Sequence, residues 1–137
     1  MSEWQYDEYP YIEFLDFTFG SIGQPEIQKE DGTISIPVRE MHILPGFPGY
    51  STEIIVLEGW LHLHGVIKSL RSLYLYDRAE GENTEKRVYT DGPFPHTEDE
   101  LYLLSLEVAT HKPIGWIGWS IVCSSVSVEI VKSKEPL

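Results

Sequence analysis

The chain has 137 residues, a length that suits one folded domain with a core of its own. Its 22 acidic and 10 basic side chains give a formal charge of −12. A surface this acidic repels phosphate backbones and anionic lipid headgroups, so the composition argues against binding to nucleic acids and membrane surfaces. We therefore expect one soluble domain over residues 1–137, with residues 1–10 forming a loosely ordered arm.

Cysteine usage and hydropathy predict a cytoplasmic protein. Cys123 is the single cysteine, so no intrachain disulfide can form. The chain starts without the basic and apolar segments of a signal peptide, and no apolar run approaches the roughly 18 residues of a membrane helix. The apolar neighbours of Cys123 predict a buried packing residue rather than a reactive thiolate.

Period-two alternation of apolar and polar residues, interrupted by turn residues, predicts strands along the whole chain. In chain order, the expected strands are residues 11–19, 24–30, 33–44, 53–67, 70–77, 85–90, 101–110 and 114–132, the last with a bend or bulge near 123–125. Asp31-Gly32 is a strong hairpin turn between the second and third strands. Residues 45–50 and 91–100 contain prolines that predict loops.

The strand expected at 53–67 has the clearest alternation. Its apolar face comprises Ile55, Leu57, Leu61 and Leu63. Its other face comprises Glu58, Trp60, His62 and His64, because side chains alternate along a strand. A tight link near residues 68–69 predicts that this strand pairs with 70–77.

The number and spacing of these strands predict the fold class. Seven to nine strands separated by frequent turns are typical of an all-β protein with two antiparallel sheets. We expect a sandwich of jelly-roll or Greek-key type. In this arrangement the loops at 45–50 and 91–100 cross from one sheet to the other.

The polar face of 53–67 suggests a metal site. Two histidines separated by one strand residue place their imidazoles about 6–7 Å apart, and Glu58 would supply a third ligand. The pair His62 and His64 resembles the His-x-His of the cupins, which also have a double-sheet fold, and the resemblance implies a bound metal ion. The alternative is that both imidazoles lie on the surface or pack on a half-buried sheet.

Aromatic residues suggest a carbohydrate platform. Trp60, Tyr74 and Tyr76 would face the same way if 53–67 and 70–77 pair, and flat aromatic faces suit sugar rings. The alternative is that these rings fill a sandwich core or form cross-strand pairs.

The acidic side chains gather in two regions. Residues 1–31 carry eight acids and one base, residues 77–100 carry eight acids and three bases, and residues 32–76 carry three of each. Acids interleaved with aromatic residues are typical of a surface that steers and anchors a protein partner. The candidate contacts are Asp7, Glu8, Tyr9, Glu98, Asp99 and Glu100. The alternative is a solvated arm and loop.

No catalytic motif accompanies these features. The sequence has no Gly-x-Ser-x-Gly elbow, no P-loop and no Gly-x-Gly-x-x-Gly. We therefore expect a non-enzymatic binding domain without a cofactor, directed at a basic protein partner. In composition it resembles the small acidic immunity-type proteins that neutralise basic toxin nucleases. A small-molecule module and an oligomer-forming structural role are the alternatives.

Overall fold

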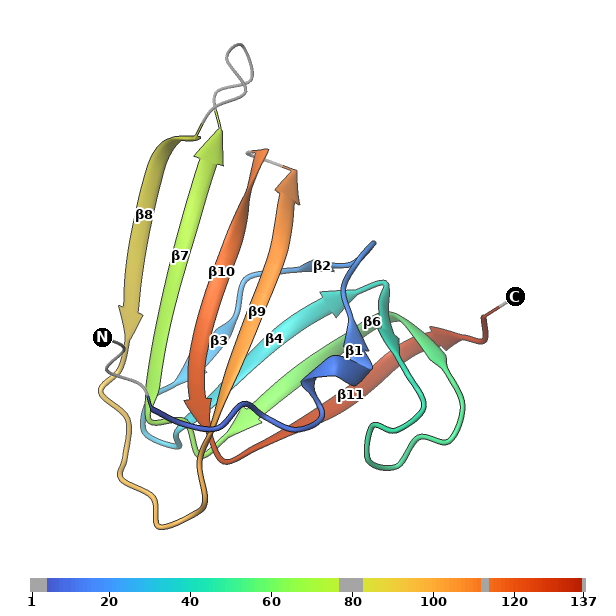
Figure 1. Ribbon diagram of the computed structural model, residues 1–137, viewed down its shortest axis with the longest axis horizontal. Coiled ribbons are helices and arrows are strands. Elements are labelled where there is room, and N and C mark those ends of the chain that lie inside the picture. Colours follow the sequence, from blue (N-terminus) through green and yellow to red (C-terminus); the bar gives the residue numbers. More distant parts are fainter. Residues whose placement is uncertain (1–4, 77–82, 112–113, 137) are drawn as a thin grey trace.

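The computed structural model describes residues 5–76, 83–111 and 114–136 (Figure 1). It confirms the predicted fold class, because the strands form two antiparallel sheets packed face to face. The helical element of the described residues is a short 3₁₀ turn, η1 (Ile12–Phe14), just before the first strand.

The larger sheet has seven strands, several of them short. These are β1 (Leu15–Asp16), β2 (Ser21–Ile22), β3 (Glu26–Gln28), β4 (Thr33–Arg39), β5 (Met41–Ile43), β6 (Ile54–His64) and β11 (Ser125–Lys134). β6 pairs with β4 and β5 along one edge and with β11 along the other. β2 and β3 extend the sheet beyond β4, and β1 extends it beyond β5.

The smaller sheet has four long strands in the order β8-β7-β10-β9. Their bounds are β7 (Lys68–Tyr76), β8 (Asn83–Asp91), β9 (Tyr102–His111) and β10 (Ile114–Cys123). Figure 1 shows that the strands of the two sheets run at a wide angle to each other. The upper end of the four-stranded sheet therefore projects beyond the seven-stranded sheet.

One two-stranded ribbon contributes to both sheets. β6 pairs with β11 and β7 pairs with β10, while residues 65–67 join β6 to β7 and Ser124 joins β10 to β11. Both links lie at one corner, where the Ser124 N–H donates to the His64 carbonyl at 2.9 Å. Gly65 has a φ of 62°, and a Cβ there would collide with Ser124, so this corner requires glycine.

The sheet topology overturns three sequence predictions about connectivity. Residues 53–67 and 70–77 do not pair, because the link between β6 and β7 carries the chain into the other sheet. The loop at 45–50 does not cross between sheets, since it joins β5 to its neighbour β6. The loop at 91–100 joins β8 to β9 within the four-stranded sheet. The crossings are made by short segments, not by the loops rich in proline.

The buried face of β6 changes phase part-way along the strand. Leu61 and Leu63 are fully buried as predicted, but Val56 is buried in place of Ile55 and Leu57. The pairing of β6 with β11 shifts register in this region, and a bulge of this kind reverses the alternation. The predicted apolar face is therefore correct only for the second half of the strand.

The core lies between the sheets and is built from alternate residues of each. Its fully buried side chains include Ile34, Ile36, Met41, Ile43, Leu61, Leu63, Leu104 and Ile121. Cys123 is also fully buried, as predicted, and burial raises the pKa of its thiol to about 12. Within the described residues, no helix has the length and hydrophobicity needed to cross a bilayer.

Candidate functional site

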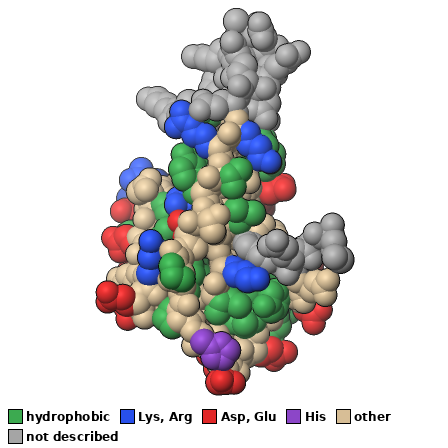
Figure 2. All heavy atoms as spheres, turned by 90° about the vertical axis from the view of Figure 1, so that its left-hand side faces the viewer, with side chains coloured by type: hydrophobic (Ala, Val, Ile, Leu, Met, Phe, Trp, Pro, Cys, Tyr) green, Lys and Arg blue, Asp and Glu red, His purple; other side chains and the backbone are tan. Residues whose placement is uncertain are grey.

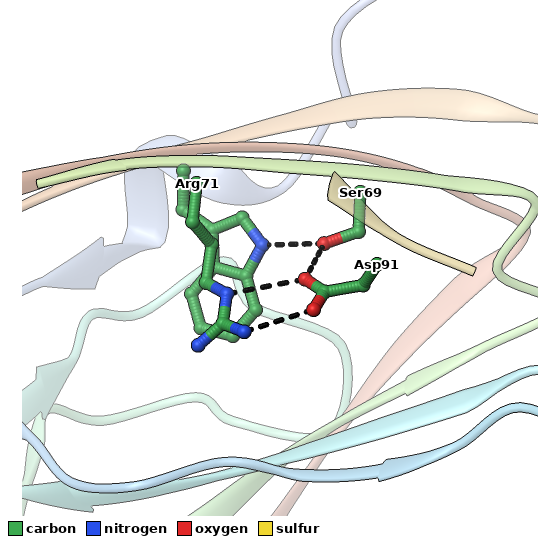
Figure 3. A network of polar contacts seen from close by, with 4 residues as sticks. Ser69, Arg71 and Asp91 are labelled. Carbon is green, nitrogen blue, oxygen red and sulfur yellow. Dashed lines mark hydrogen bonds and ion pairs between the residues drawn. The ribbon is translucent and has the colours of Figure 1, made fainter. Parts of the chain in front are cut away.

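Polar side chains lie on the inner face of the four-stranded sheet, where an apolar surface is the rule. We call Ser69, Arg71, Asp91 and Trp119 the arginine network (Figure 3). β7 supplies Ser69 and Arg71, which share a face because they are two residues apart. The register places Ser69 opposite Asp91 of β8, and Arg71 opposite Trp119 of β10. Three neighbouring strands therefore build one cluster.

Hydrogen bonds connect the four side chains into a single path. The Trp119 indole Nε1 donates to the Ser69 hydroxyl at 2.8 Å, and that hydroxyl donates to Asp91 Oδ2 at 2.6 Å. Arg71 binds the same carboxylate with two nitrogens, Nε at 3.1 Å and Nη2 at 2.8 Å. Paired donors of this kind fix the orientation of the guanidinium as well as neutralising the carboxylate.

Aromatic rings hold the guanidinium on both flanks. Its central carbon lies 5.4 Å from the centre of the Tyr89 ring and 5.2 Å from that of Trp119. The side chain of Arg71 is 23% exposed, whereas that of Asp91 is 9% exposed. Figure 3 shows that the third guanidinium nitrogen, Nη1, makes no hydrogen bond within the network. Within the part of the chain that the structure describes, one edge of the guanidinium therefore keeps free donors.

Two members of the network, Arg71 and Trp119, form the floor of a cleft of about 430 Å³ between the two sheets, together with Tyr89. Ile22 of β2 and residues 23–25, which connect β2 to β3, line the other side, and Leu73 and Ile117 complete the walls. This volume falls within the range of small-molecule sites, and the combination of apolar walls with a few fixed polar groups is typical of them. We call this space the wedge cleft.

The predicted acidic residues converge at a second place. The backbone of residues 7–9 runs beside the start of β9: the Leu103 N–H donates to the Asp7 carbonyl and the Tyr9 N–H donates to the Leu103 carbonyl, each at 2.8 Å. Residues 98–100 directly precede β9 and are exposed. The structure therefore brings the N-terminal acids to the same end of β9 as the acids of the 91–100 loop.

Tyr9 is placed differently from the prediction. Its side chain is only 7% exposed and packs in the core, so little of it is accessible at the surface. Burial raises the pKa of its hydroxyl. The exposed aromatic residue is its neighbour Tyr11, whose ring centre lies 5.7 Å away.

We call the resulting surface the acidic–aromatic edge. It comprises Asp7, Glu8, Tyr11, Glu98, Asp99, Glu100 and Tyr102. Glu100 accepts a hydrogen bond from Tyr102, and this carboxylate is the main reason that the pKa of the Tyr102 hydroxyl is raised. Asp7 and Tyr11 raise the same pKa through their charge, which shows that the two acidic segments act on one tyrosine.

The two predicted histidines lie together on the outer face of β6. Their ring centres are 6.4 Å apart, but both imidazoles already have protein partners. His62 is hydrogen-bonded to Ser35 at 2.7 Å and to Glu129 at 2.9 Å. His64 is hydrogen-bonded to Ser127 at 2.9 Å.

Glu58 does not complete a metal site with these histidines. It lies at the register shift of β6, where the strand loses its simple alternation. Across residues 5–76, 83–111 and 114–136, no three His, Cys, Asp or Glu side chains are arranged to hold a metal ion. The predicted ligand set is therefore not assembled.

The predicted aromatic platform is divided between the sheets. Trp60 of β6 stacks on His62 with the ring centres 6.3 Å apart, whereas Tyr74 of β7 stacks on Trp116 at 4.3 Å. These two pairs lie on different sheets because β6 and β7 do not pair. The side chain of Tyr76 lies outside the described residues.

Sequence reasoning missed the arginine network. Arg71 is a charged residue in the interior of β7, between Leu70 and the apolar run that follows Ser72, and this position is the signal that could have marked it. Asp91 gave no such signal, because it opens a segment expected to be a loop.

Comparisons with known proteins identify no relative of this chain. The chain matches no family model, no curated protein and no solved structure.

Proposed function

We propose that the protein is a non-enzymatic binding domain that recognises a basic protein through the acidic–aromatic edge. Its concrete form is an immunity-type protein that neutralises a basic partner in the cytoplasm. The observation that carries the proposal is the meeting of two acidic segments, separated by about 90 residues of chain, at the start of β9. The parallel bridge between Glu8 and Leu103 holds them together.

Charge distribution supports an electrostatic role for this surface. Figure 2 shows acidic side chains at the lower end of the molecule and along its flanks, while the basic side chains of this face lie above the lower end. The loop between β8 and β9 occupies the lower end in Figure 1. A localised excess of negative charge accelerates encounter with a cationic surface and orients it.

Aromatic packing supplies a firm base for a partner contact. The rings of Tyr102, Tyr9, Tyr11, Phe47 and Tyr50 form a continuous series with centre-to-centre distances of 5.7–6.4 Å. Tyr11 is 38% exposed within this series. Tyrosine anchors surrounded by charged residues are typical of the centre and rim of protein interfaces.

A charge-matched pair of variants tests the proposal. The test variant combines Asp7→Asn, Glu8→Gln and Asp99→Asn on the acidic–aromatic edge. The control variant combines Glu40→Gln, Glu58→Gln and Glu135→Gln, which are exposed elsewhere and remove the same charge. Each protein is immobilised, exposed to extract from the source cells at low salt, and eluted with a salt gradient.

We expect the wild type and the control variant to retain the same basic protein, and the test variant to lose it. Elution at moderate salt is expected because exposed charges are screened within about 10 Å at 0.1 M salt. The proposal is wrong if no basic protein is retained at low salt, or if the two variants retain it equally.

A further inference from the structure

The wedge cleft is independent of the acidic–aromatic edge and combines groups that suit a small ligand. Its walls are the apolar side chains of Ile22, Pro25, Leu73 and Ile117, and its floor is the aromatic clamp around Arg71. Its lining residues come from β7, β8 and β10 on one side and from β2 and the segment before β3 on the other, so its floor rests on three paired strands.

The floor offers directed hydrogen-bond donors. Asp91 occupies Nε and Nη2 of Arg71, and no described residue bonds to Nη1. The rings of Tyr89 and Trp119 hold the guanidinium plane, so its free edge has a fixed direction. A donor fixed in this way favours a ligand that presents an acceptor oxygen, because little side-chain freedom is lost on binding.

The charge of the site selects a neutral acceptor over an anion. Asp91 neutralises the guanidinium through two hydrogen bonds, so the Arg71–Asp91 pair carries no net charge. The whole chain carries a formal charge of −12, which disfavours anions further. The neutral oxygen that best matches an N–H donor is a carbonyl.

We propose that the wedge cleft binds a small neutral molecule with an apolar body and a carbonyl oxygen, such as an amide, with the carbonyl accepting from Nη1 of Arg71. The apolar body packs against Leu73 and Ile117. This site goes beyond the proposed partner surface and does not depend on it.

Three probes of similar shape test the ligand chemistry in the wild-type protein. Benzamide has the neutral carbonyl, benzoate has a charged acceptor, and toluene has none. Binding is followed by NMR through the Nε–H signal of Arg71 and the indole N–H signal of Trp119, the latter assigned by its loss in Trp119→Phe. We expect saturable shifts with benzamide at a Kd of about 1–10 mM, as small ligands of this size allow.

We expect benzoate and toluene to bind at least about fivefold more weakly than benzamide, since a carbonyl acceptor is the recognised group. Tighter binding of benzoate would contradict a neutral ligand, and equal binding of toluene would contradict the role of Arg71. Absence of any saturable shift with 50 mM benzamide, about five times the weakest expected Kd, would overturn the site itself.

A pair of tryptophan variants locates the binding. Leu73→Trp fills the cleft, whereas Val88→Trp adds the same side chain to an exposed position on β8, where Val88 is 53% exposed. Benzamide binding is expected to disappear in Leu73→Trp and to persist in Val88→Trp. Circular dichroism checks that both variants fold, and unchanged binding in a folded Leu73→Trp variant would place the ligand elsewhere.

Discussion

The arginine network and the outer histidine face use similar groups in opposite surroundings. Each joins a tryptophan, a serine and a carboxylate across neighbouring strands. Asp91 is 9% exposed and accepts three hydrogen bonds, whereas Glu129 is 58% exposed and, among the residues that the structure describes, is bonded to His62 only. Loss of a partner is costly for a charged group that is largely buried between the sheets, whereas a group on the outer face has water as an alternative partner. We therefore expect the hydrogen bonds of Asp91 to contribute much more to the stability of the fold than the hydrogen bond of Glu129.

Thiol reactivity should show the largest difference between the two surroundings. The pKa of Cys123 is raised to about 12, against an ordinary value of 9.0, so thiolate at pH 8 is reduced about 1,000-fold. We expect Cys123 to react with dithiobis(nitrobenzoate) at least that much more slowly in the folded protein than in urea. A cysteine introduced by Ser125→Cys, on an exposed residue of β11, should react rapidly. Rapid labelling of Cys123 in the folded wild type would show that the sheets separate readily.

Removal of the buried carboxylate should destabilise the protein far more than removal of its exposed counterpart. Asp91→Ala leaves the guanidinium of Arg71 and the hydroxyl of Ser69 without an acceptor, and we expect a loss of about 3 kcal/mol in the free energy of unfolding. Glu129→Ala breaks only an exposed pair, and its expected cost is at most about 1 kcal/mol. Urea unfolding measures the loss of stability in both variants. Similar losses would show that the buried and the exposed carboxylate contribute equally.

Removal of the Ser69 hydroxyl should also destabilise the protein more than removal of the Ser127 hydroxyl, but by a smaller amount. Ser69→Ala leaves the buried indole N–H of Trp119 without its acceptor, and we expect a cost of about 2 kcal/mol. Ser127→Ala removes the partner of His64 at an exposed position, where water replaces the hydroxyl, and we expect less than about 0.5 kcal/mol. A neutral Ser69→Ala would mean that Trp119 finds another acceptor.

The pH dependence of stability should show the smallest effect. The pKa of His64 is lowered from its ordinary 6.5, first by burial and then by the charge of His62. The His64 imidazole therefore binds a proton more readily in the unfolded chain than in the folded protein. Its contribution to the free energy of unfolding is complete above pH 6.5 and is lost as the pH falls through the pKa of His64 in the folded protein.

His64→Gln removes this titration, so its urea midpoint should fall less than that of the wild type between pH 7.5 and pH 5.5. His96→Gln, at a position 83% exposed, should follow the wild type. An equal fall in His64→Gln and the wild type would assign the pH dependence to other groups.

The sequence predicted those features that depend on one strand at a time. Period-two alternation is a property of a single strand, so it located the long strands and placed His62 and His64 on one face. The phase change at Glu58 could not be predicted in this way, because it arises from pairing with β11. The separation of Trp60 from Tyr74 was missed for a similar reason, since a short link between strands does not reveal whether they share a sheet.

Features that depend on the pairing of several strands could not be predicted from the sequence. The arginine network requires the register of β7 against both β8 and β10, which brings Ser69 beside Asp91 and Arg71 beside Trp119. The acidic segments were recognised by composition, but their meeting beside Leu103 depends on the path of the N-terminal chain. The composition identified the residue types involved, but their proximity in space depends on pairing between distant segments of the chain.

The two-stranded ribbon that bends at Gly65 and Ser124 has a consequence for how the chain folds. Its two sides come from residues 54–76 and 114–134, so neither sheet reaches its native pairing until segments separated by dozens of residues have met. Joining such distant segments carries a large loop-closure entropy, and proteins dominated by these contacts fold in milliseconds to seconds. Both sheets are therefore completed only when β10 and β11 pair with β7 and β6. Loss of β10 and β11 would leave unpaired strand edges in both sheets.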